Sequence, residues 1–92
     1  MKYKVEFKRS AANGFKKLPK LEKKRIGEKI DSLSEDLPDT KSTKMKGENP
    51  FHRIRSGDYR IIYEIDEDAK MIVILKIGHR KDVYKRLYMT KP

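Results

Sequence analysis

The segment from Phe51 to Gly78 constrains the fold more than any other part of the chain, because its residues alternate like β-strands around two turn sequences. Gly57-Asp58 suits a two-residue hairpin loop with glycine at its first central position, and Asp66-Glu-Asp-Ala69 suits a second turn. The expected strands are residues 51–56, 59–66 and 70–78. This order predicts a three-stranded antiparallel meander.

The first part of the chain predicts one strand followed by two helices. Residues 3–8 alternate between apolar and charged side chains, as a strand with one buried face does. Ser10 is a suitable N-cap for a short helix over 11–18, and Pro19 suits the start of a longer helix over 20–37. The longer helix carries one apolar stripe, which consists of Ile26, Ile30, Leu33 and Leu37.

Two further segments complete the chain, a polar connection over 38–50 and a short helix over about 81–87. The expected element order is β-α-α-β-β-β(-α). This order predicts a small α+β fold that forms a single domain over residues 1–92. In such a fold the N-terminal helical hairpin packs on a twisted, mostly antiparallel sheet.

Composition excludes several classes of function. The 92 residues include no cysteine, which excludes a disulfide framework, a thiol nucleophile and a thiolate metal site. Only His52 and His79 could ligate zinc, and no carboxylates are spaced to complete such a site, so we expect no metal and no cofactor. The longest apolar run, Met71 to Leu75, is too short for a membrane span, and the N-terminus lacks an apolar signal region. We therefore expect a cytoplasmic protein with no membrane partner.

The formal net charge of +10 predicts a polyanionic partner, either nucleic acid or an acidic protein. The length of the first turn decides how the arginines are arranged. With a two-residue loop, Arg55 lies opposite Arg60, and Arg53 shares their face. The apolar residues of the same two strands then share the other face: Ile54, Ile61 and Tyr63. A three-residue loop would separate the arginines, and the sequence leaves both registers open.

Simple alternation divides the last strand of the meander into two faces. One face carries Met71, Val73, Leu75 and Ile77, and the other carries Ile72, Ile74 and Lys76. Lys76 and, beyond the strand, Arg80 are expected to join the arginines. A single arginine here is as readily a solvated cation as a ligand, but several converging cations with few carboxylates beside them favour a surface that binds phosphate.

Several short motifs resemble, in their order and spacing, the RelE/ParE toxin superfamily, and within it the RelE ribonuclease toxins. They are Thr43-Lys-Met-Lys-Gly47, Arg53-Ile-Arg55, Gly57-Asp-Tyr-Arg-Ile-Ile-Tyr63 and Gly78-His-Arg-Lys-Asp-Val-Tyr84. With the strand-helix-helix start, the resemblance covers nearly the whole chain. It implies the toxin of a type II toxin–antitoxin pair, an endoribonuclease that cleaves mRNA in the ribosomal A site and so inhibits translation. The implied partners are a cognate antitoxin, the ribosome and mRNA.

The resemblance also implies a catalytic set of basic residues on the sheet and a late tyrosine. The matching positions are Arg53, Arg55, Arg60, Arg80 and Tyr84. The chemistry implied is metal-independent attack by the substrate's own 2′-OH. The first-strand positions are lysines in the best-known RelE, and arginine is a poor proton acceptor because it stays protonated. The identity of the general base is therefore open.

His79 has two interpretations. Histidine ordinarily titrates near neutral pH, which makes His79 a candidate proton shuttle and adds it to the catalytic set. Strand parity instead points His79 toward the core as a structural residue, and the same holds for His52. The candidate RNA-binding residues are Lys44, Lys46, Lys76 and Lys81.

Two other functions fit part of the pattern. A ParE-like inhibitor of DNA gyrase would have no nuclease activity, but that branch generally lacks the dense arginine set and the late tyrosine. A non-catalytic RNA-binding module would usually expose aromatic side chains on its sheet, whereas Tyr59 and Tyr63 here fall on the expected core side.

Overall fold

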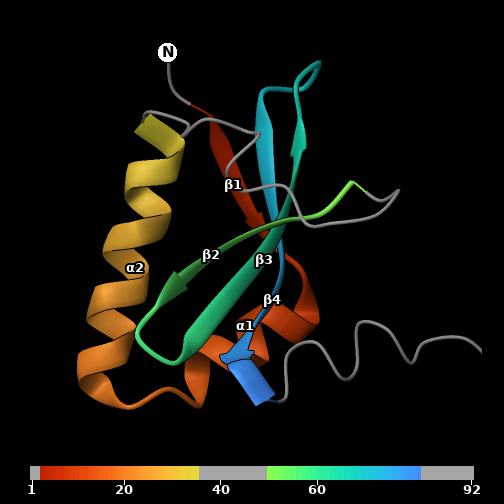
Figure 1. Cartoon of the computed structure of the whole chain (residues 1–92). Helices are drawn as coiled ribbons and strands as arrows, with labels where there is room; N and C mark the ends of the chain where they lie inside the picture. Colours follow the sequence, from red (N-terminus) through yellow and green to blue (C-terminus); the bar gives the residue numbers. More distant parts are fainter. Residues whose placement is uncertain (1–2, 36–49, 82–92) are drawn as a thin grey trace, which may run out of the picture.

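The computed structural model describes residues 3–35 and 50–81, and the statements below concern these residues. Its elements are β1 (Lys4–Phe7), α1 (Arg9–Lys16), α2 (Lys20–Glu35), β2 (His52–Ser56), β3 (Tyr59–Asp66) and β4 (Met71–His79). The strands form one sheet in the order β1-β4-β3-β2, in which β1 is parallel to β4 and the other neighbours are antiparallel (Figure 1). The predicted α+β class and element order are confirmed. Most of the connection over 38–50 and of the helix over 81–87 lies outside the described residues.

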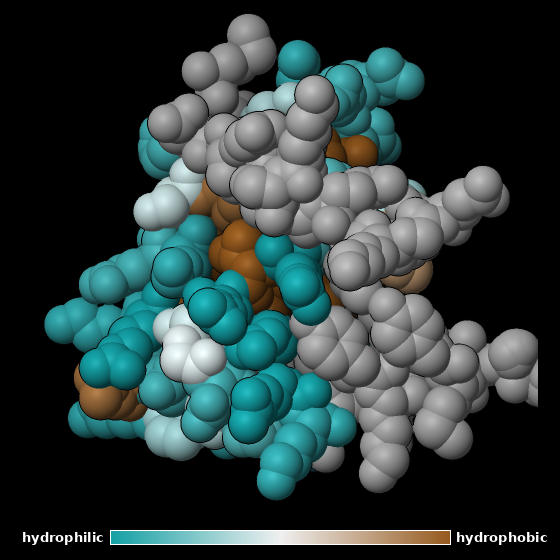
Figure 2. All heavy atoms as spheres, in the orientation of Figure 1, coloured by the Kyte–Doolittle hydropathy of each residue, from teal (hydrophilic) through white to brown (hydrophobic). Residues whose placement is uncertain are grey.

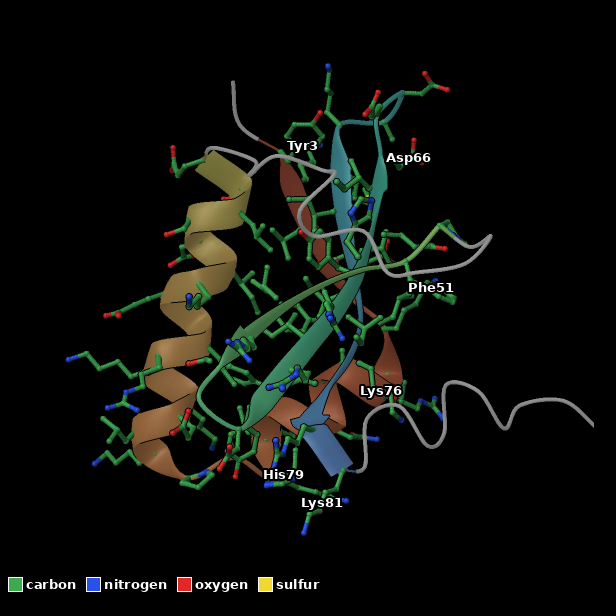
Figure 3. All side chains as sticks on the ribbon, viewed as in Figure 1. Tyr3, Phe51, Asp66, Lys76, His79 and Lys81 are labelled. Atoms are coloured by element: carbon green, nitrogen blue, oxygen red, sulfur yellow. The ribbon has the colours of Figure 1, made fainter. Side chains whose placement is uncertain are left out.

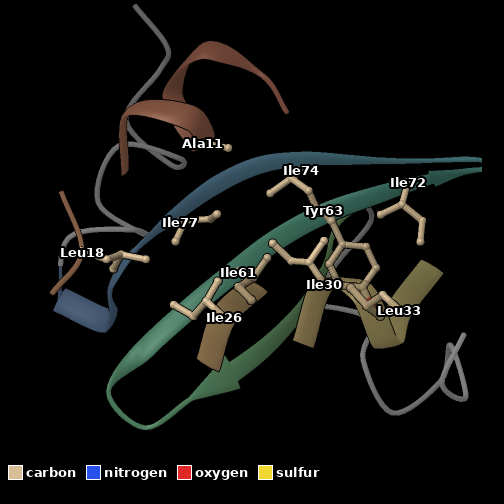
Figure 4. Close-up of a cluster of buried hydrophobic side chains, with 10 residues drawn as sticks. All are labelled: Ala11, Leu18, Ile26, Ile30, Leu33, Ile61, Tyr63, Ile72, Ile74 and Ile77. Carbon is tan, nitrogen blue, oxygen red and sulfur yellow. The ribbon is translucent and has the colours of Figure 1, made fainter. Parts of the chain in front are cut away.

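Helix α2 covers one face of the sheet and buries its apolar stripe there (Figure 4). Ile26, Ile30 and Leu33 of this stripe are buried, as predicted, whereas Leu37 lies outside the described residues. The strand residues in the same cluster are Ile61, Tyr63, Ile72, Ile74 and Ile77. Full burial of an aliphatic side chain contributes about 1.5–3 kcal/mol, so this cluster dominates the stability of the fold. The other face of the sheet is turned away from α2.

Helix α1 lies beside the second half of β4, where β1 has already ended. The Lys8 N–H donates to the Ile74 carbonyl at 2.9 Å and closes the β1–β4 pairing. The backbone of α1 then approaches β4 so closely that a Cβ on Gly14 would collide with the carbonyl oxygen of Ile77. Glycine at position 14 therefore sets how near α1 comes to the sheet.

The predicted N-cap of α1 is wrong. The N-cap is Lys8, which makes no side-chain capping hydrogen bond, and Ser10 lies inside the first turn. The Lys8 carbonyl already accepts the Ala12 N–H at 2.9 Å, so the helix begins as soon as the strand ends. The Ser10 hydroxyl is thereby available for a contact outside the helix.

The β2–β3 hairpin has the two-residue turn, which is one of the two possibilities that the sequence left open. Ser56 pairs with Tyr59, and Arg55 pairs with Arg60, so the register with a three-residue loop is excluded. Gly57 adopts φ +63°, a left-handed conformation that glycine takes at no steric cost. This turn places the arginines of the two strands on one face.

A β-bulge in β4 overturns the simple alternation expected for that strand. Ile62 pairs with Lys76 and the next residue, Tyr63, pairs with Ile74, so Leu75 has no partner in the ladder. An extra residue in one strand reverses its inward and outward positions from there on. The prediction that Ile77 shares a face with Met71, Val73 and Leu75 is therefore wrong, because Ile77 joins Ile72 and Ile74 in the core.

Most of the described surface in the view of Figure 2 is hydrophilic. Among the described large apolar side chains, Phe7 and Leu21 are the exposed ones, and Phe7 makes an edge-to-face contact with Phe15. Neither helix of the described ranges combines the length and apolar character that a membrane crossing requires.

Candidate functional site

Two rows of paired residues run across β2, β3 and β4 on the face turned away from α2. One row is Arg55, Arg60 and Gly78, and the next row is Arg53, Ile62 and Lys76. Residues paired in this way point to the same side of a sheet. We call the side that carries Arg53, Arg55, Arg60 and Lys76 the arginine face. The predicted gathering of these four cations is thus present in the structure.

Exposure differs across the arginine face. Arg53 and Arg55 on the edge strand β2 are exposed, Arg60 and Lys76 are half-buried, and Ile62 is fully buried between them. Ile62 lies outside the α2-facing cluster. Arg53 and Lys76 pair with Ile62 from either side, so these cations border an apolar centre, beside which a long side chain can pack its stem while its charged end stays accessible.

The carbonyls of the hairpin turn bring Arg60 and Arg80 together. Nη1 of Arg60 donates to the Gly57 carbonyl at 3.3 Å and to the Tyr59 carbonyl at 3.4 Å. The carbonyl between them, that of Asp58, accepts the backbone N–H of Arg80 at 2.9 Å. Three successive carbonyls thus position the Arg60 guanidinium and the Arg80 backbone at the same end of the sheet.

Little negative charge opposes these cations. Within residues 3–35 and 50–81, no carboxylate forms an ion pair with Arg55, Arg60 or Arg80. The ion pair between Arg25 and Glu22, with 3.6 Å between Nη1 and Oε2, is on α2 and away from this face. The nearest acid on this face of β3 is Glu64, opposite Val73 and four residues from Arg60, and Asp66, opposite Met71, lies further away at the end of the strand. Guanidiniums without carboxylate partners attract anions, and their planar fork suits phosphate.

The bulge aims Lys76 at the arginine face. Its Nζ donates to the Ser10 hydroxyl at 2.9 Å, which links the first turn of α1 to β4. Figure 3 shows Lys76 apart from His79 and Lys81, which lie together at the end of β4. The contact with Ser10 was not foreseen, because the sequence pattern assigned that serine to a helix cap.

His79 lies on the other face of the sheet. It pairs with Tyr59, and the two rings form an edge-to-face contact with centroids 5.7 Å apart. Its Nδ1 accepts the backbone N–H of Lys81 at 3.2 Å. Of the two interpretations of His79, this geometry favours the structural one.

The aromatic residues of the hairpin are on the core side, as expected. Tyr63 is fully buried and stacks on His52, which is 8% exposed, with ring centroids 5.4 Å apart. Tyr59 is half-buried against the same cluster. These rings are therefore not displayed for stacking on RNA bases.

The remaining candidates are less fully placed. Lys81 is exposed and follows Arg80 at the end of β4, while Lys44, Lys46 and Tyr84 lie outside the described residues. No group of three or more histidine and carboxylate side chains within the described ranges is arranged to hold a metal ion.

Comparison with known proteins adds a family relationship. Residues 5–84 match the family described as the ParE toxin of type II toxin–antitoxin systems, parDE. RelE1 of Methanocaldococcus jannaschii is 32% identical over 88 residues, which are 92% of this chain and 98% of that protein. Toxin RelE3 of the same organism is 35% identical over 85 residues, which are 88% of this chain and 94% of that protein.

A solved structure shows the same fold. It is that of an archaeal RelE–RelB complex from Pyrococcus horikoshii, with a TM-score of 0.72 and 30% identity. The match covers 90% of this chain and 100% of that chain. Sequence and structure therefore point to the same set of relatives.

Proposed function

This chain belongs to the ParE toxin family, within the RelE/ParE superfamily of type II toxins, and on that premise we propose that it is a ribosome-dependent endoribonuclease that cleaves mRNA in the ribosomal A site. The arginine face carries this proposal. Arg55, Arg60 and the adjacent Arg80 lie near one another without a carboxylate ion pair in the described part of the chain. The names of the full-length relatives support the RelE branch over the gyrase-inhibiting branch.

The proposed reaction uses the 2′-OH of RNA as nucleophile. Its oxygen forms a bond to the adjacent phosphorus while the bond from phosphorus to the 5′-oxygen breaks. The products are a 2′,3′-cyclic phosphate and a free 5′-OH, after one proton leaves the 2′-OH and one reaches the 5′-oxygen. Negative charge grows on the phosphoryl oxygens during the reaction, and fixed cations that meet it supply much of the catalysis.

Each arginine has a proposed role. Arg55, Arg60 and Arg80 bind the reacting phosphate, and Arg53 binds the neighbouring backbone of the mRNA. Nη1 of Arg60 is occupied by turn carbonyls, which leaves its other N–H groups to face the phosphate. Tyr84 is proposed to stack on a base or to orient the hydroxyl, and Lys44, Lys46, Lys76 and Lys81 to contact RNA backbone.

None of the residues proposed to bind the phosphate is a good proton acceptor for the 2′-OH. Arginine serves poorly as a base, and His79 lies across the sheet from the arginine face with Nδ1 already accepting a hydrogen bond. We therefore propose that phosphate stabilisation supplies most of the rate, and we keep His79 as the residue to test for proton transfer.

We further propose a cognate antitoxin as the physiological partner, because the Pyrococcus relative forms a complex with RelB. An acidic segment of such a protein would neutralise the arginine face and block access of mRNA. The gene for it is expected beside the gene for this chain.

Primer extension on programmed ribosomes tests the function. The wild type is expected to cut within the A-site codon, and Arg60→Ala to cut about 10²–10³ times more slowly, as for a lost oxyanion donor. Arg25→Ala is the control at saturating toxin, since it removes the same charge from α2. If the wild type leaves mRNA intact but traps gyrase–DNA complexes, the ParE-like function replaces the one proposed.

A further inference from the structure

Gly78 lies on the arginine face among cations. It pairs directly with Arg60 on β3. Lys76 precedes it by two residues on β4, and Arg80 follows it by two. A glycine in this place leaves a gap in a row that is otherwise made of arginine side chains.

The described structure gives no steric reason for a glycine at this position. Gly78 is not among the residues with a positive φ, whereas Gly57 is, at +63°. A Cβ built on Gly78 would meet no described atom within 4 Å, whereas one on Gly14 would collide with the Ile77 carbonyl. The pair between Gly78 and Arg60 is regular, because the bulge at Leu75 lies three residues earlier in β4.

Glycine in the interior of a strand weakens it, and one common reason for its presence is the close approach of a ligand. We propose that the bare backbone at Gly78 forms the floor of the RNA site, so that the sugar–phosphate backbone of the mRNA lies directly against β4. This proposal rests on the proposed endoribonuclease function and adds a substrate-contacting residue to it.

The surroundings of Gly78 fit a phosphodiester group. Arg60 is beside the floor, and its Nη1 is drawn toward the turn carbonyls of Gly57 and Tyr59 rather than over Gly78. Lys76 is held toward α1 by Ser10. Among the described residues, the space over Gly78 is thus bordered by positive charge and left open, and a side chain there would lift the phosphate away from the cations. A misplacement of about 1 Å can lower a rate about a hundredfold.

Substitutions of increasing size at this position test the proposal. Gly78→Ala and Gly78→Val add volume on the arginine face, and Gly27→Ala on α2 is the matched control, since it also meets nothing within 4 Å. For each variant, single-turnover cleavage of mRNA on programmed ribosomes is measured at saturating toxin, together with the melting temperature. We expect rates about tenfold lower for Ala and about a hundredfold lower for Val, with melting temperatures no lower than that of the wild type.

The outcomes separate the two proposals. A size-graded loss of cleavage in variants at least as stable as the wild type supports the floor, because replacing a glycine that the fold itself required would lower the melting temperature. If the wild type cleaves mRNA and Gly78→Val cleaves it equally fast, the proposal for Gly78 is wrong, while the proposed nuclease function is unaffected. A wild type that cuts no mRNA overturns the nuclease function and this proposal with it.

Discussion

Arg55 and Arg60 lie directly opposite each other on β2 and β3, next to the Ser56–Tyr59 pair that closes the hairpin turn. Like charges in this arrangement destabilise an antiparallel pair. Arg60 has turn carbonyls as partners, and neither guanidinium has a carboxylate ion pair within the described residues. Packing does not account for two arginines here, whereas the proposed phosphate between them would.

Replacing Arg55 is therefore expected to raise the stability of the fold and to lower the rate of mRNA cleavage. Arg55→Thr should raise the free energy of unfolding by about 0.2–1 kcal/mol, because it removes the repulsion and threonine suits a strand. It should lower mRNA cleavage about a hundredfold, as for one lost cation at the phosphate. Urea unfolding at low and high salt measures the first effect, which should shrink as salt screens the repulsion. Lys29→Thr on α2 is the control, and a loss of stability in Arg55→Thr would contradict the interpretation.

The hairpin turn offers a second prediction, because Gly57 has φ +63° and its carbonyl accepts from Arg60. Gly57→Val places a β-branched residue in a conformation that it avoids, at a cost of about 1–3 kcal/mol. We expect lower stability and slower cleavage, since the carbonyls that position Arg60 and Arg80 move with the turn. Gly57→Asn tolerates the conformation and should stay close to the wild type in both measurements. Equal rates for the two variants would show that the turn does not position these arginines.

Most of the sheet was predictable because its turns and alternation are local. Gly57-Asp58 suits the two-residue loop that places Arg55 opposite Arg60, and of the two registers that the sequence left open the structure has this one. The bulge at Leu75 was not predictable from alternation, and it lies where the pairing of β1 with β4 ends at Ile74. No sequence pattern indicated that Gly14 packs against Ile77, that Ser10 binds Lys76 or that β1 pairs with β4 in parallel. These contacts join segments far apart in the chain, so local pattern does not encode them.

The close approach of α1 to β4 gives a third prediction. A methyl group on Gly14 would collide with the Ile77 carbonyl, and both backbones are held by hydrogen bonds and packing. Gly14→Ala is expected to lower the free energy of unfolding by about 1–3 kcal/mol, as overpacking does. Gly27→Ala, in open space on α2, should instead raise it by up to about 1 kcal/mol through helix propensity. Urea unfolding of both variants compares them, and two changes of the same sign would argue against this packing.

His79 can be tested by separating its hydrogen bond from its ability to carry a proton. Its Nδ1 accepts the Lys81 N–H at 3.2 Å, which holds the backbone next to Arg80. The Oδ1 of Asn occupies nearly the same place and accepts a hydrogen bond, but the amide does not titrate. If His79 is structural, single-turnover cleavage by His79→Asn should stay within a few-fold of the wild type, while His79→Ala should fall about tenfold as Arg80 loses its support. A proton shuttle would make Asn and Ala equally slow, by about 10²–10⁴-fold. The His79→Asn rate therefore decides whether proton transfer belongs to this face of the sheet or to groups on the arginine face.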